Sequence, residues 1–149
     1  MLEEDKSIYA KSISPMLQAG VIYVLMLIFN IFSYFASFTD LFMIKQGAPW
    51  VIFSSFLLFY ALINSILSIA ARDRNKYWLY SILSYAGLGL AGGTTAWLIS
   101  GLTMDEAGTY RWILFIFTFG YVLLLSIVRA MRKIVTMAQK QDKRLRGEE

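Results

Sequence analysis

The chain alternates between long uncharged runs of apolar residues and short clusters of charged ones. Residues 16–38, 49–71 and 77–101 contain no Asp, Glu, Lys or Arg, and a fourth uncharged run covers 112–128. A helix of about 20 apolar residues crosses the roughly 30 Å hydrocarbon layer of a bilayer. The pattern therefore predicts an all-α integral membrane bundle of four transmembrane helices, near 16–38, 49–71, 77–101 and 110–130.

Residue types that begin and end helices fall at the edges of these runs. Pro15 and Pro49 each stand at the start of a run, where proline is favoured because its fixed φ suits the first helical turn. Gly101 is a stop signal for the third helix. Thr103 and Glu106 have the spacing of a capping box, which predicts that the fourth helix begins there.

Basic residues are distributed unevenly between the loops and ends of the predicted helices. Of the 14 lysines and arginines, only Lys45 and Arg111 fall in the first and third loops, and the other twelve fall in the N-terminal segment, the second loop and the tail. Because cytoplasmic segments are enriched in Lys and Arg, both termini are expected in the cytoplasm. The predicted plan is a cytoplasmic segment at 1–13, a transmembrane domain at 14–130 and a basic amphipathic cytoplasmic tail at 131–149, which extends the fourth helix.

The composition restricts the chemistry that the chain could carry. Hydrophobic residues make up 58% of the sequence and charged residues 16%, whereas soluble domains are about a quarter charged. Cysteine and histidine are absent, which removes thiol chemistry and the commonest metal and haem ligand. All ten acidic residues fall outside the four apolar runs. We therefore expect neither an enzyme nor a carboxylate-driven transporter, and we expect no cofactor and no metal.

Two asparagines interrupt the apolar runs. At about 1.5 Å per residue, counting from the helix ends places Asn30 in the outer half of the first helix and Asn64 in the inner half of the second. The counting predicts two polar layers, an outer one around Asn30 and an inner one around Asn64. Such layers are either hydrogen-bonded contacts between helices, worth about 0.6 to 2 kcal/mol each, or the lining of a path for a small neutral solute. The outer layer would also hold Thr94, Thr95 and Thr118, and the inner layer Tyr23, Ser84, Tyr85 and Tyr121.

Small residues are concentrated in the third predicted helix. Gly89 and Gly93 form a GxxxG pair, and Gly87 and Ala91 repeat the same spacing on a second face. Small residues allow the backbones of membrane helices to approach closely. We therefore expect this helix to pack closely inside the bundle or against a partner.

The C-terminal tail carries an apolar stripe and several basic residues. The stripe recurs at alternating steps of four and three residues, as along one face of a helix, at Ile127, Met131, Ile134, Ala138, Gln141 and Leu145. Either the tail is a solvated extension that contacts anionic lipid headgroups, or it docks on a partner through the stripe. Nucleic-acid binding is not expected, because no aromatic residues interleave with the basic ones. The candidate docking residues are Arg129, Met131, Arg132, Lys133, Ile134, Lys140, Lys143, Arg144 and Leu145.

These features favour a small accessory or assembly subunit of a larger membrane complex, with other membrane subunits or further copies of itself as partners. The alternative is a small homo-oligomeric channel, transporter or pore-forming protein for a neutral or hydrophobic solute, with the asparagine layers as its lining. Co-purification with a fixed set of membrane proteins would favour the first, and a lone homo-oligomer the second. The expected location is the inner membrane of a bacterium.

Overall fold

The computed structural model is all-helical, as the hydropathy pattern predicts. The structure describes residues 13–39, 45–71 and 74–147, so the predicted N-terminal segment lies almost entirely outside the described residues. Every helix is long and apolar enough to cross a membrane, which confirms the prediction of four candidate transmembrane helices. The helices are α2 (Pro15–Phe38), α3 (Ala48–Ser68), α4 (Arg74–Ser100) and α5 (Tyr110–Leu145).

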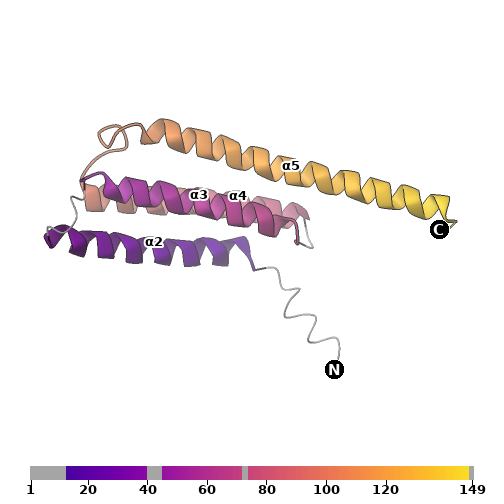
Figure 1. Ribbon diagram of the computed structural model, residues 1–149, viewed down its shortest axis with the longest axis horizontal. Coiled ribbons are helices and arrows are strands. Elements are labelled where there is room, and N and C mark those ends of the chain that lie inside the picture. The colour runs from indigo at the N-terminus through magenta and orange to yellow at the C-terminus, as the bar shows by residue number, and fades with distance from the viewer. Residues whose placement is uncertain (1–12, 40–44, 72–73, 148–149) are drawn as a thin grey trace, which may run out of the picture.

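The helix α3 is the centre of the bundle. It packs against α2, α4 and α5, whereas α2 and α4 also pack against each other and α5 rests mainly on α3. Figure 1 shows the four helices side by side, with α5 running past the ends of the other three. We call the end that holds Pro15, Ser68 and Arg74 the basic end, and the end that holds Phe38, Ala48 and Ser100 the far end.

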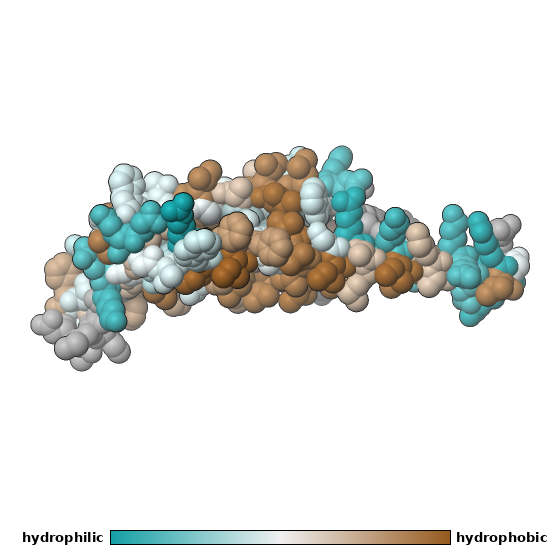
Figure 2. Space-filling view, turned by 90° about the horizontal axis from the view of Figure 1, so that it is seen from above, coloured by the Kyte–Doolittle hydropathy of each residue, from teal (hydrophilic) through white to brown (hydrophobic). Residues whose placement is uncertain are grey.

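The core lies along α3 and consists largely of aromatic side chains. Tyr60 and Phe53 of α3 are buried, and Tyr121 of α5 and Met26 of α2 pack into the same cluster. The middle of the bundle presents an apolar surface, and hydrophilic residues gather toward both ends and along the extension of α5 (Figure 2). This distribution is the one that a membrane-spanning bundle requires.

Capping chemistry fixes several helix ends. The Ser14 side chain accepts a 3.3 Å hydrogen bond from the Leu17 amide, and Pro15 occupies the first turn of α2. Pro49 lies in the first turn of α3. Gly101 follows the last residue of α4 with a φ of 66°, which suits glycine because it lacks a Cβ. The predicted stop at Gly101 is thus confirmed.

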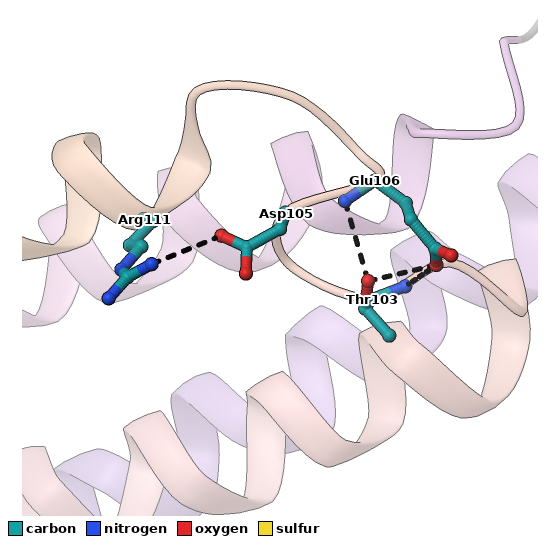
Figure 3. A network of polar contacts seen from close by, with 4 residues as sticks. All are labelled: Thr103, Asp105, Glu106 and Arg111. Atoms are coloured by element: carbon teal, nitrogen blue, oxygen red, sulfur yellow. Dashed lines mark hydrogen bonds and ion pairs between the residues drawn. The ribbon is translucent and has the colours of Figure 1, made fainter.

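The capping box forms, but it does not begin the fourth helix. The Thr103 amide and hydroxyl each donate a 2.8 Å hydrogen bond to Glu106 Oε2, and the Glu106 amide donates back to the Thr103 hydroxyl (Figure 3). These bonds close a turn, and α5 begins only at Tyr110. The prediction was wrong because Gly108, with a φ of 128°, takes the chain out of the helical region first.

The helix α5 continues without a break through residue 130, where the predicted transmembrane domain ends. Its 36 residues correspond to about 54 Å at about 1.5 Å per residue. A hydrocarbon layer is about 30 Å thick. The C-terminal part of α5 therefore projects beyond the bundle at the basic end, as Figure 1 shows.

Candidate functional site

A hydrogen-bonded cluster inside the bundle draws one side chain from each of the four helices. We call it the four-helix network, and its members are Gln18 of α2, Asn64 of α3, Tyr77 of α4 and Tyr121 of α5. Asn64 Nδ2 donates to Gln18 Oε1 at 3.0 Å and to the Tyr77 hydroxyl at 3.4 Å. The Tyr121 hydroxyl donates to Asn64 Oδ1 at 2.7 Å, and Gln18 Nε2 donates to the Tyr77 hydroxyl at 3.0 Å.

Asn64 is the hub of this network because both ends of its amide are used. Its side chain is completely buried, and it contacts residues of all three neighbouring helices. An asparagine amide offers two donors and one acceptor oxygen with two lone pairs. Here both donor and acceptor functions are satisfied by other members of the network, so the burial of Asn64 leaves no unmet polar atom on it.

Aromatic rings enclose the network on the side of the core. The rings of Tyr85 and Tyr121 stack with centroids 4.5 Å apart, and Tyr60 lies 6.3 Å from each of them. The Tyr60 hydroxyl donates to the Ser81 carbonyl oxygen at 3.3 Å. The enclosed arrangement favours fixed contacts between helices over a wet passage, because the polar atoms already bond one another.

The structure brings together some residues of the predicted layers and separates others. Tyr121 does bond Asn64, but the Tyr23 hydroxyl shares a 2.9 Å hydrogen bond with Thr95, which the counting placed in the other layer. Tyr85 likewise reaches across the predicted layers, to Thr118 at 3.2 Å. Counting from helix ends ignores that a tyrosine hydroxyl lies far from its own backbone and that helices start at different levels.

Asn30 does not assemble an outer layer. Its Nδ2 donates to the Met26 carbonyl of its own helix at 2.9 Å, and its Oδ1 has no hydrogen-bond partner among the described residues. The Thr94 hydroxyl likewise donates to a carbonyl of its own helix, that of Leu90, at 2.7 Å. Ser84 is buried on α4. Asn30 instead borders an open pocket of about 150 Å³ near the far end, together with Ser33 and Ser37 of its own helix.

Sequence reasoning missed Gln18 and Tyr77 as members of the network. Tyr77 reads equally well as an aromatic marker of the membrane interface, since tyrosine is enriched there. Gln18 offered a clearer signal, because it is a strongly polar residue inside the first apolar run. A buried glutamine amide requires partners, and the Ile13 carbonyl, Asn64 and Tyr77 supply them.

The closest approach of helices at the glycine cluster occurs at Gly92. A Cβ on Gly92 would lie 2.5 Å from a ring carbon of Phe53 and 3.3 Å from the Met26 sulfur. A Cβ on Gly93 would be 3.9 Å from the Phe53 ring, and one on Gly89 would meet nothing within 4 Å. The GxxxG pair therefore does not mark the tightest contact inside the bundle.

Gly87 and Ala91 lie on the surface instead, at an open groove between α2 and α4. The groove has a volume of about 340 Å³ and is also lined by Gly20 and Tyr23. A Cβ on Gly87 would likewise meet nothing within 4 Å. The face of α4 that carries Gly87 and Ala91 is thus open to contact with another molecule.

Basic residues of α5 contact the other helices at the basic end. Arg129 donates to the Asn75 side chain at 3.3 Å and stacks over the Trp78 ring at 5.6 Å. Arg132 donates to the Ala71 carbonyl at 3.1 Å. These two arginines therefore connect α5 to the end of α3 and the start of α4.

Beyond Arg132, α5 leaves the bundle and exposes apolar side chains. Ile134 is 64% exposed and Leu145 82%, and Met131, the residue before Arg132, is 60% exposed. Lys133, Lys140, Lys143 and Arg144 lie on the same part of the helix, and all four are exposed. A helix end that shows both apolar and basic side chains to its surroundings is amphipathic.

No protein-family model, curated protein or solved structure matches the chain. Among the described residues, no group of three or more acidic, histidine or cysteine side chains could hold a metal ion. The site must therefore be interpreted from its own geometry, which offers hydrogen bonds between helices and an exposed amphipathic helix end.

Proposed function

We propose that the chain is a non-enzymatic accessory or assembly subunit of a larger membrane complex, and that the end of α5 is its docking element. The observation that carries the proposal is the exposure of Ile134 and Leu145 on the part of α5 that follows Arg132 and projects past the bundle, with the exposed Met131 at its start. About 24 Å of α5 exceeds the thickness of the hydrocarbon layer. Apolar side chains that gather on one exposed face outside the lipid mark a site of interaction with another protein or a membrane.

The interior of the bundle supports a structural role for its polar residues. The four-helix network joins all four helices, and its members bond one another. A solute path would need polar groups that are available to the solute, whereas Asn64 is completely buried and fully bonded. This favours a rigid bundle that presents α5 over a bundle that conducts.

The proposed orientation has both termini in the cytoplasm of a bacterium, with the basic end at the inner face of its cytoplasmic membrane. Twelve of the 14 basic residues fall in the segments on that side, and the positive-inside rule assigns such segments to the cytoplasm. The docking element would then meet a cytoplasmic domain or the cytoplasmic part of another membrane subunit.

A homo-oligomeric channel or transporter is the second candidate, and the groove between α2 and α4 is the observation that favours it. Its lining by Gly20, Gly87 and Ala91 would let a helix of another copy approach closely. In that assembly the groove, and not the end of α5, would be the contact surface.

Two methionines of α5 provide a matched test. Met131 belongs to the apolar stripe, whereas Met137 lies about 120° away around the helix, and the two are 60% and 58% exposed. The full-length protein should be extracted from its native membrane in mild detergent, and its bound proteins identified by mass spectrometry. We expect Met131→Glu to lose a fixed set of partners that the wild type and Met137→Glu retain.

Equal retention of partners by both variants would contradict docking through the stripe. Recovery of the wild type as a lone oligomer of identical chains would contradict the subunit proposal and favour the channel. Circular dichroism of each variant serves as the control for folding, because both side chains lie outside the core.

A further inference from the structure

Residues of α4 and α5 form an open crevice at the basic end. The crevice has a volume of about 400 Å³, and Trp78 of α4 forms one of its walls. The other wall is one face of α5, because its members follow the steps of three and four residues that align side chains along a helix. These members are Ser126, Arg129, Ala130 and Lys133.

The guanidinium group of Arg129 is held in place inside this crevice. It lies over the Trp78 ring at 5.6 Å and donates to the Asn75 side chain at 3.3 Å. A guanidinium carries five N–H donors in a planar fork that matches the oxygens of a phosphate. The contacts with Trp78 and Asn75 therefore orient a group that still has donors for an anion.

The ring of Trp78 is the part of this residue that serves the crevice, because Arg129 rests on it. Its Nε1–H is buried and has no hydrogen-bond partner among the described residues. This N–H is covered by the protein, so Trp78 contributes its ring to the crevice and not a donor to a ligand.

The charge of the crevice is positive. Lys133 lies one helical turn beyond Arg129 and adds a second cation. Among the described residues, Asp105 and Glu106 are at the far end, and Asp142 is nine residues further along α5 than Lys133, which is about 14 Å. Asp73 lies outside the described residues. The described lining therefore offers no carboxylate to a positively charged ligand group.

An apolar track leads from the crevice toward the far end along the same face of α5. Val122, Phe119 and Phe115 continue the spacing of the crevice residues, and they are exposed. In a bilayer this track would lie in the hydrocarbon layer, directly beside the crevice at the interface. A ligand with an anionic head and apolar chains fits both parts.

We propose that this crevice binds an anionic phospholipid, with its phosphate at Arg129 and Lys133, and its acyl chains along the apolar track. Basic pockets between membrane helices are suited to such headgroups. A zwitterionic phospholipid would bind less well, because its cationic group finds no carboxylate in the described lining. The proposal requires only that the bundle spans a membrane, so it stands apart from docking through α5.

Native mass spectrometry of the purified full-length protein tests the proposal. Phosphatidylglycerol and phosphatidylcholine with identical acyl chains are titrated separately. We expect the wild type to prefer phosphatidylglycerol, and Lys133→Gln to lower that affinity about fivefold, as expected for one cation at a membrane surface. The double variant Arg129→Gln with Lys133→Gln should lose the preference.

The matched control is the double variant Lys140→Gln with Lys143→Gln, which removes the same charge from α5 outside the crevice. The affinity of this control for phosphatidylglycerol should stay within about twofold of the wild-type affinity.

Three results would overturn the proposal. The first is equal affinity of the wild type for the two lipids. The second is an equal loss of affinity in the crevice variants and in the Lys140 and Lys143 control. The third is displacement of the lipid by an excess of inorganic phosphate. The second would indicate diffuse attraction to the whole tail, and the third a site for a soluble anion. The Lys133 side chain is exposed, so its variant remains informative even if Arg129 variants unfold.

Discussion

The Tyr121 hydroxyl donates a 2.7 Å hydrogen bond to Asn64 Oδ1, and neither side chain exposes more than 2% of its surface. The two residues are 57 positions apart in the chain, and their bond joins the last helix to the central one. Tyr121 and Leu125 are the buried residues of α5, so this bond is the polar contact between α5 and the interior of the bundle.

Asn64→Leu should destabilise the bundle by about 2 kcal/mol, because it leaves the buried polar groups of Gln18 and Tyr121 without their partner. Asn30→Leu is the matched control, since Asn30 is equally buried but bonds only its own helix. It should change stability by less than about 0.5 kcal/mol. Unfolding in detergent, followed by circular dichroism, measures both. Similar losses at the two positions would show that the network adds nothing beyond packing.

Gly92→Ala should destabilise the bundle by about 1 to 3 kcal/mol, because the added Cβ would overlap the Phe53 ring and force a shift in the core. Gly89→Ala adds the same methyl group where nothing lies within 4 Å. It should be neutral or slightly stabilising, because alanine has the higher helix propensity. The melting temperatures of the two variants in one detergent give the comparison. A drop at Gly89 in an oligomeric sample would instead point to a partner on that face.

Thr103→Ala should raise the pKa of the Glu106 carboxyl toward its ordinary value. The Thr103 amide and then its hydroxyl hold that pKa below the usual range, and the substitution removes only the hydroxyl. Because the pKa is lowered in the folded state, the turn gains its stabilisation above the unfolded pKa and loses it as the pH falls through the folded pKa. A carboxylate titration by nuclear magnetic resonance measures the shift, and Thr103→Ser should leave the pKa unchanged.

Reporter fusions after Arg74 and after Arg146 should both report the cytoplasm, and a fusion at Gln46 should report the outside. The expectation follows from the excess of basic residues in the segments at the basic end. A cytoplasmic signal at Gln46 would exclude the proposed orientation. Replacing Lys45 with Gln should leave all three signals unchanged, because it only increases the asymmetry.

The hydropathy pattern was sufficient to predict the four helices, because the cost of placing charges in hydrocarbon confines them to the loops. It could not place side chains around the helix axes. Asn64 was recognised as an intramembrane polar residue, but its partners Gln18 and Tyr77 depend on how the helices cross. The tight contact at Gly92 depends equally on where the Phe53 ring points, which no spacing of small residues reveals.

The predicted start of the fourth helix was wrong because a glycine further along the chain interrupts the helical backbone. The capping box at Thr103 and Glu106 has the right residues and the right bonds, yet Gly108 redirects the chain before Tyr110. The crevice beside Trp78 was not foreseen either. The sequence places Trp78 and Arg129 51 positions apart, and only the packing of α5 against the bundle brings them into contact.

The central position of α3 also has a consequence for the order in which the chain is assembled. Ribosomes deliver the N-terminal helices first, and α2, α3 and α4 pack against one another without help from α5. Until the last helix joins them, Asn64 Oδ1 lacks the donor that Tyr121 supplies in the complete fold. The three-helix intermediate therefore carries one unpaired amide acceptor in the membrane, and synthesis of the final helix is the step that removes it.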